Sequence, residues 1–79
     1  MPELDKRPVK LTVVLATGSI QLQMPYKPAA IAELKYRFDK SVRTYNPDTK
    51  LWVIRGVENA PLAVKIAETF FADVQIGYQ

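Results

Sequence analysis

The sequence predicts a small α+β domain with the element order β-β-α-β-β-α and a short final strand as an option. Three observations predict it. Residues 19–24 alternate apolar and polar side chains, as a half-buried strand does. Residues 29–40 and 60–71 carry apolar side chains at helical spacing. A turn sequence, Asn46–Lys50, separates two runs rich in β-branched and aromatic residues. We expect an antiparallel-rich sheet with both helices packed on one face.

The length of the chain, 79 residues, corresponds to a single small domain. Its hydrophobic fraction of 48% is typical of globular chains. Residues 1–8 are charged and contain two prolines, so we expect a loosely ordered lead-in. Residues 9–79 then form the single α+β domain.

The first hairpin is predicted from Val9 to Met24. Leu11, Val13 and Leu15 fall on one face of its first strand. Thr17-Gly18-Ser19 is a turn signal. In the second strand Ile20, Leu22 and Met24 alternate with Gln21 and Gln23, which gives this strand a polar outer face.

The first helix is expected from Ala29 to about Lys40. Pro28 suits the first helical position, where its missing N–H is not needed. Glu33 and Arg37 can pair on the exposed side. The stripe that faces the sheet is Ile31, Leu34 and Phe38.

The second hairpin combines the strands Val42–Tyr45 and Leu51–Ile54 with a four- or five-residue loop. Pro47 has the φ angle that a type I turn requires, and the Asn46 side chain can bond to the backbone two residues on. Both sides of the return strand are apolar. The alternation therefore leaves open whether Trp52 is a core anchor or an exposed platform for stacking.

The second helix is expected from Ala60 to Phe71. Asn59 suits its N-cap, and Pro61 lies in the first turn. Its predicted core stripe is Leu62, Ile66 and Phe70, joined by Ala63 and Ala67. Asp73–Ile76 is a candidate final strand, followed by the tail Gly77–Gln79.

Catalytic and metal chemistry lack their usual residues here. The chain has no Cys and no His, which removes thiolate and imidazole ligands and nucleophiles. Asp39 and Asp48 have no partner carboxylate at helical or hairpin spacing. We therefore expect a non-catalytic protein with no cofactor and no metal. With no apolar leader and no long apolar run, we also expect a cytoplasmic protein without a membrane partner.

Positive charge is concentrated in the middle of the chain. The net charge is +3, yet residues 27–55 alone hold seven Lys and Arg against three acidic residues. Such a patch favours binding to phosphates. Arg43 and Lys50 flank the predicted turn, where we expect their side chains to lie close together. The candidate nucleic-acid-binding residues are Lys35, Arg37, Lys40, Arg43, Tyr45, Lys50, Trp52 and Arg55.

A little over half of the chain, from about Leu22 to Ile66, resembles the HARP domain. Leu34-Lys35 match the helix element of that family. Arg43, Tyr45, Asn46–Lys50 and Trp52 match its hairpin, and the run Leu62–Ile66 fits the helix that follows. HARP domains accompany annealing helicases, and related small domains accompany phage branch-migration helicases. No Walker-type sequence occurs in this chain, so we expect that any use of ATP in this family cannot take place in this chain alone.

The resemblance implies a DNA-binding accessory domain in DNA repair or recombination. Such a domain recognises branched DNA or single-strand/duplex junctions and supports annealing, with a helicase acting in trans. Its location is then cytoplasmic, at the nucleoid, or nuclear in a eukaryote. The residues leave RNA open as the ligand. They also leave open a second function, a phage or mobile-element module that binds a helicase or host protein through its open sheet face, with Gln21 and Gln23 in the contact.

Overall fold

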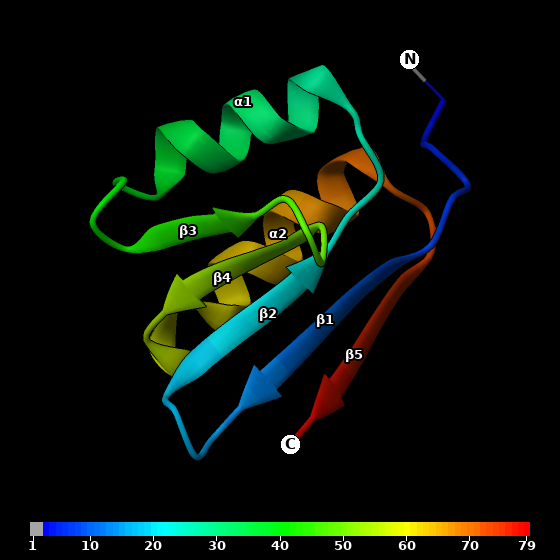
Figure 1. Cartoon of the computed structure of the whole chain (residues 1–79). Helices are drawn as coiled ribbons and strands as arrows, with labels where there is room; N and C mark the ends of the chain where they lie inside the picture. Colours follow the sequence, from blue (N-terminus) through cyan, green and yellow to red (C-terminus); the bar gives the residue numbers. More distant parts are fainter. Residues whose placement is uncertain (1–2) are drawn as a thin grey trace.

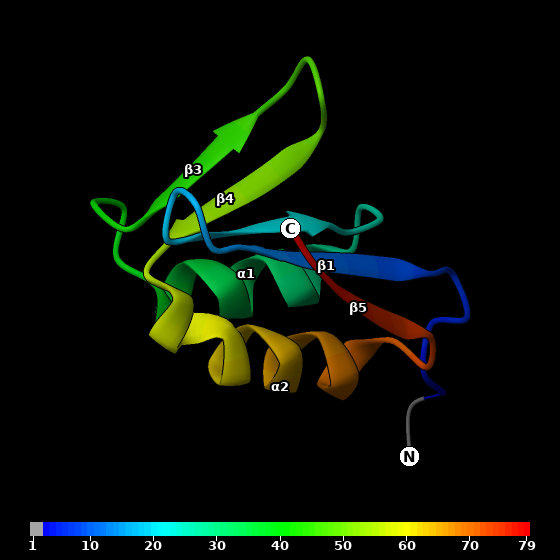
Figure 2. The same ribbon diagram turned by 90° about the horizontal axis from the view of Figure 1, so that it is seen from below.

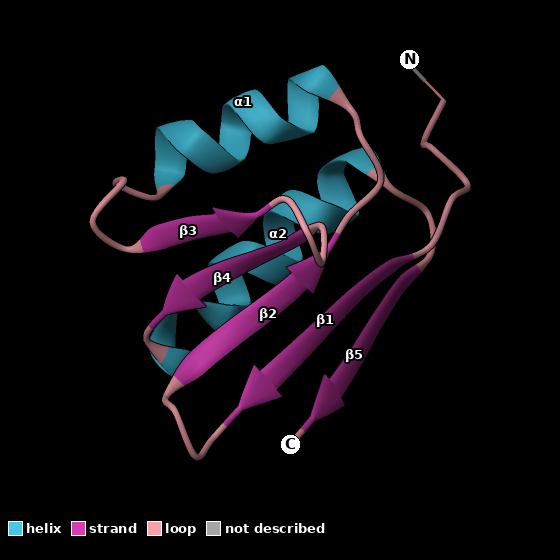
Figure 3. Cartoon of the chain, viewed as in Figure 1, coloured by secondary structure: helices cyan, strands magenta, loops and turns pink. Residues whose placement is uncertain are grey.

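The computed structural model describes residues 3–79, so Met1 and Pro2, part of the predicted lead-in, lie outside it. The chain alternates hairpins and helices as predicted and ends in a fifth strand (Figures 1 and 3). The elements are β1 (Val9–Val14), β2 (Ser19–Gln23), α1 (Pro28–Arg37), β3 (Arg43–Asn46), β4 (Leu51–Arg55), a 3-10 turn (Val57–Asn59), α2 (Ala60–Phe70) and β5 (Val74–Tyr78).

The five strands form one sheet in the order β3-β4-β2-β1-β5. All neighbours are antiparallel except β1 and β5, which run parallel. Figure 2 shows both helices on the same face of the sheet and the opposite face uncovered by them. The predicted α+β class and the one-sided helix layer are therefore confirmed. The optional final strand is present.

The core lies between the sheet and the two helices. Alternate residues of three strands supply one side of it: Val9, Leu11, Val13, Ile20, Leu22, Trp52 and Ile54. The helices and the residues that follow them supply the other side: Ala30, Leu34, Phe38, Ala63, Ile66, Ala67 and Phe71. Trp52, only 7% exposed, is the core anchor of the second hairpin. The sequence left open on which side of the sheet the Trp52 side chain lies. In the structure it lies on the side that the helices cover.

Two expectations about the core were wrong. Leu15 lies beyond the end of β1 and is 65% exposed. In α2 the deeply buried residues are Ala63, Ile66 and Ala67, while Leu62 and Phe70 pack only at the margin. Phe71, at the C-cap, is the fully buried aromatic. Ala63, Ile66 and Ala67 are thus buried as predicted, and only Leu62 and Phe70 were placed too deep in the core.

Two helix ends also differ from expectation. α1 stops at Arg37, with Phe38 extended at the C-cap. Asn59 makes no side-chain cap on α2, and its Nδ2 donates instead to the carbonyl of Arg55 at 2.8 Å. The 3-10 turn before α2 supplies a helical entry, so the cap is not required.

Gly77 and Tyr78, expected in a tail, belong to β5.

The segment before β1 is fixed to the C-terminal end of α2. The backbone N–H of Asp5 donates to the carbonyl of Phe70 at 3.0 Å, and the N–H of Ala72 donates to the carbonyl of Asp5 at 2.8 Å. The carboxylate of Asp5 accepts hydrogen bonds from Arg7, and these lower the pKa of Asp5 well below its usual range. Within residues 3–8, the expected loose lead-in is thus joined to the domain at Asp5.

Candidate nucleic-acid interface

One groove of about 1130 Å³ lies at the end of the sheet where β1 begins and β2 ends. Ile31 and Lys35 of α1 line one side of it, and residues of the β3–β4 hairpin line another. The segment Gln23–Tyr26 and four residues near the starts of β1 and β5 complete the lining. Figure 2 shows that the β3–β4 hairpin bends away from the layer formed by β1 and β2.

The turn between β3 and β4 positions Lys50 at the tip of the hairpin. The side-chain oxygen of Asn46 accepts the N–H of Asp48 at 2.9 Å, as the sequence predicted. The loop has four residues and ends at Lys50, whose φ of 58° is left-handed. That conformation closes the turn back into β4 and leaves the Lys50 side chain exposed beside the groove.

The charged residues that line the groove are all cations: Arg7, Lys10, Lys35, Arg43 and Lys50. Two of these have structural partners. Arg7 pairs with Asp5 at 2.6 Å and donates to the carbonyl of Tyr26, and Arg43 donates from Nε to the carbonyl of Phe38 at 2.9 Å. Among residues 3–79, Lys10, Lys35 and Lys50 form no ion pair, and all three are exposed. These lysines are available for an anionic ligand.

Aromatic rings are interleaved with these charges. Tyr45 and Trp52 are cross-strand partners whose ring centroids lie 4.8 Å apart. Trp52 is buried, so Tyr45, which is 45% exposed, presents the accessible ring of this pair. Tyr26, on the segment after β2, is 74% exposed. The groove therefore offers two tyrosine faces beside cations, the combination that binds unpaired bases and phosphates.

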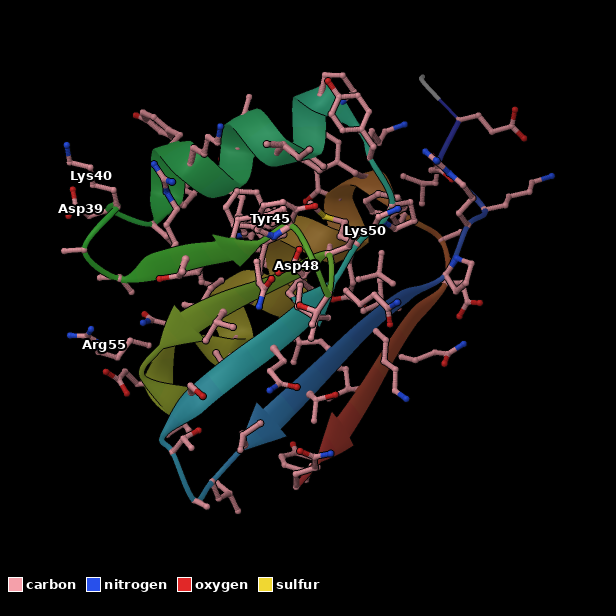
Figure 4. The ribbon with its side chains drawn as sticks, viewed as in Figure 1. Asp39, Lys40, Tyr45, Asp48, Lys50 and Arg55 are labelled. Carbon is pink, nitrogen blue, oxygen red and sulfur yellow. The ribbon has the colours of Figure 1, made fainter. Side chains whose placement is uncertain are left out.

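Five of the eight predicted binding residues line this groove, and three do not. Lys35, Arg43, Tyr45, Lys50 and Trp52 are brought together. Arg37 pairs with Glu33 at 2.6 Å on the outer side of α1, as the helical spacing predicted. Lys40 and Arg55 lie at the opposite end of the hairpin from Lys50 (Figure 4).

The expected closeness of Arg43 and Lys50 across the ladder was wrong. Arg43 begins β3 and pairs with Ile54, whereas Lys50 follows the turn at the other end of the hairpin. The direct partner of Trp52 in β3 is Tyr45. The two cations share the groove because it runs along the hairpin.

Sequence reasoning missed three charged or aromatic residues of the lining, Arg7, Lys10 and Tyr26. Lys10 carried a usable signal, since alternation assigns it to the face opposite Leu11. Its pairing with Gln23 and Gln75 at the end of the sheet could not be read from the sequence. Arg7 is held at the groove by Asp5 and by the carbonyl of Tyr26.

Asp39, one of the carboxylates singled out in the sequence, has a structural role. Asp39 accepts the Ser41 hydroxyl at 2.6 Å and the Ser41 N–H at 3.0 Å, which lowers the pKa of Asp39. In residues 3–79 no cluster of acidic side chains is suited to a metal ion. Asp39 thus stabilises the turn between α1 and β3.

Comparison of the chain with protein-family models, curated proteins and solved structures found no match. Among residues 3–79, no helix is both long and apolar enough to cross a membrane.

Proposed function

We propose that this protein is a non-catalytic nucleic-acid-binding module and that the groove is its binding site. The observation that carries the proposal is the lining itself: five cations, no acidic residue, and two exposed tyrosines at one end of the sheet. Lys10, Lys35 and Lys50 neutralise backbone phosphates, the main sequence-independent source of affinity for nucleic acids. Tyr45 and Tyr26 stack on bases, and Trp52 braces Tyr45 from the core.

The HARP-like motif supports the same site. Its residues Lys35, Arg43, Tyr45, Lys50 and Trp52 come from a helix and two strands, and all of them line the one groove. On this reading the ligand is branched DNA or a single-strand/duplex junction. The module then supports annealing or remodelling in repair or recombination, together with a helicase acting in trans.

Fluorescence anisotropy with labelled single-stranded, duplex and forked oligonucleotides, each at several salt concentrations, tests the proposal. The informative variant replaces Lys10, Lys35 and Lys50 with Gln. Each lost phosphate contact reduces the slope of log K against log salt by roughly 0.7–0.9, so we expect a slope flatter by about two units. Arg43 is left intact because its hydrogen bond to Phe38 stabilises the fold.

The matched control removes the same amount of charge outside the groove by replacing Arg37, Lys40 and Arg55 with Gln. We expect this variant, and Lys65→Gln on α2, to bind nearly as well as the wild type. Equal losses in the two triple variants would mean that the whole basic surface binds without a defined site. No affinity for any oligonucleotide at low salt would refute the nucleic-acid function. The protein-binding module, acting through Gln21 and Gln23 on the uncovered sheet face, would then be the better reading.

A further inference from the structure

The outer edge of β5 has no partner strand in the described chain, because β5 is the last strand of the sheet order. The hydrogen bonds at the two ends of β5 show which of its backbone groups face β1 and which face outward. Val9 N–H donates to the carbonyl of Asp73, and Gln79 N–H donates to the carbonyl of Val13, both at 2.8 Å. Backbone groups alternate in direction along a strand. Val74, Ile76 and Tyr78 therefore point their N–H and C=O groups away from β1, toward solvent.

The same three residues carry apolar side chains on the helix side of the sheet. Their register partners in β1 are Val9, Leu11 and Val13, all of which are buried. In contrast, Ile76 is 50% exposed and Tyr78 is 74% exposed. The edge thus combines unpaired backbone groups with exposed apolar side chains.

The opposite edge of the sheet is protected in the usual ways. β3 is short, begins with Arg43 and is followed by Pro47. Charges and prolines at an edge discourage pairing with another chain. β5, Val-Gln-Ile-Gly-Tyr, has neither. Only β5 therefore remains suited to strand addition.

We infer that β5 is the interface for a second copy of this chain, which pairs with it antiparallel about Ile76. The sequence is self-complementary in that register. Ile76 lies opposite the partner's Ile76, and Val74 lies opposite the partner's Tyr78, a favourable β-branched and aromatic pair. The strand is uncharged, so the two copies meet without like-charge contacts within it.

The pair has a defined geometry. A two-fold axis perpendicular to the sheet joins the five-stranded sheets into one continuous sheet with all helices on one face. Each outward-pointing residue exchanges two N–H···O bonds with its opposite number. The groove lysines lie on β1, α1 and the β3–β4 turn, so pairing leaves them accessible. A junction of two short strands is smaller than a standard protein interface, and we expect a weak dimer.

Single cysteines test the register, because the chain has no Cys of its own. Hydrogen-bonded antiparallel partners have Cα atoms about 5.5 Å apart, within reach of a disulfide. On mild oxidation we expect Ile76→Cys to form a disulfide-linked homodimer. Val74→Cys and Tyr78→Cys should cross-link to each other when mixed, and much less when oxidised alone. Thr44→Cys on the β3 edge is the control and should stay monomeric.

Sedimentation and hydrogen exchange on the unmodified chain complete the test. We expect reversible dimerisation from micromolar to near-millimolar concentration, weakened at least tenfold by Ile76→Lys and not by Thr44→Lys. The amides of Ile76 and Tyr78 should exchange more slowly as concentration rises, whereas Gln75 and Gly77 should not change, since β1 already holds them. A wild-type protein that remains monomeric over this range, or Thr44→Cys linking as readily as Ile76→Cys, would overturn the inference.

Discussion

The ring of Tyr45 lies against the ring of Trp52, with centroids 4.8 Å apart and ring planes tilted by 48°. The two residues face each other across the β3–β4 ladder. Trp52 is buried in the core, and Tyr45 is exposed to the groove. A ligand that contacts Tyr45 is therefore one ring away from the only Trp of the chain.

The Tyr45–Trp52 pair predicts a separation between binding and folding. Tyr45→Ala should weaken oligonucleotide binding by about tenfold, since one base–aromatic stack contributes roughly 1–3 kcal/mol. Tyr45→Phe keeps the ring and should bind like the wild type. Trp52→Ala should instead lower the free energy of unfolding by about 3–5 kcal/mol. Anisotropy and urea titrations measure the two effects. Unchanged binding by Tyr45→Ala would remove this residue from the site.

Core truncations should follow the observed burial. Phe71→Ala and Leu34→Ala each remove a fully buried side chain and should cost about 2–5 kcal/mol of unfolding free energy. Phe70→Ala, its sequence neighbour at the margin of the core, should cost clearly less. Chemical denaturation of the three variants gives the ranking. A larger loss for Phe70→Ala than for Phe71→Ala would contradict the packing of the end of α2.

Acid should weaken the attachment at Asp5. Its hydrogen bonds with Arg7 lower the pKa of the folded-state carboxyl below the ordinary value of 3.8. The stabilisation is therefore complete above about pH 4 and is lost as pH falls through the folded-state pKa. Asp5→Asn should lower the melting temperature at pH 7, and its difference from the wild type should shrink below pH 4. A difference that is independent of pH would exclude the ion pair as its source.

Lys50 combines a charge with a left-handed backbone, and substitutions can separate the two. Its φ is 58°, a conformation that Asn and Gly tolerate best. Lys50→Asn should bind nucleic acid less tightly and keep its melting temperature. Lys50→Val should lose the same affinity and also about 1–2 kcal/mol of stability. Equal melting temperatures for these two variants would show that the turn relaxes at this position.

Local turn chemistry and periodicity predicted most of the fold. Asn46 and Pro47 fixed the second hairpin because their preferences act within a few residues. The alternation of Ile20 and Leu22 with glutamines fixed β2. In α2 the prediction was correct for Ala63, Ile66 and Ala67 but placed Leu62 and Phe70 too deep, because apolar residues surround much of that helix.

The candidate site was only partly accessible to the same reasoning. Lys35, Arg43, Tyr45, Lys50 and Trp52 are close enough in sequence for the helix–hairpin unit to gather them. Arg7 and Lys10 reach the groove through pairings with distant segments, Asp5 with Phe71 and Lys10 with Gln75. Contacts of that kind depend on how the whole sheet assembles, so they cannot be predicted from the local sequence.

The parallel pairing of β1 with β5 has a consequence for synthesis on the ribosome. Val9 of β1 pairs with Val74 of β5. One edge of β1 therefore stays unpaired until almost all of the described chain has left the ribosome. Non-local pairings of this kind raise contact order and slow folding. A nascent chain that ends before β5 exposes the edge of β1, which contains Leu11 and Val13, and such intermediates aggregate or recruit chaperones. Closure of β5 onto β1 is then the late event that commits the nascent chain to its native state.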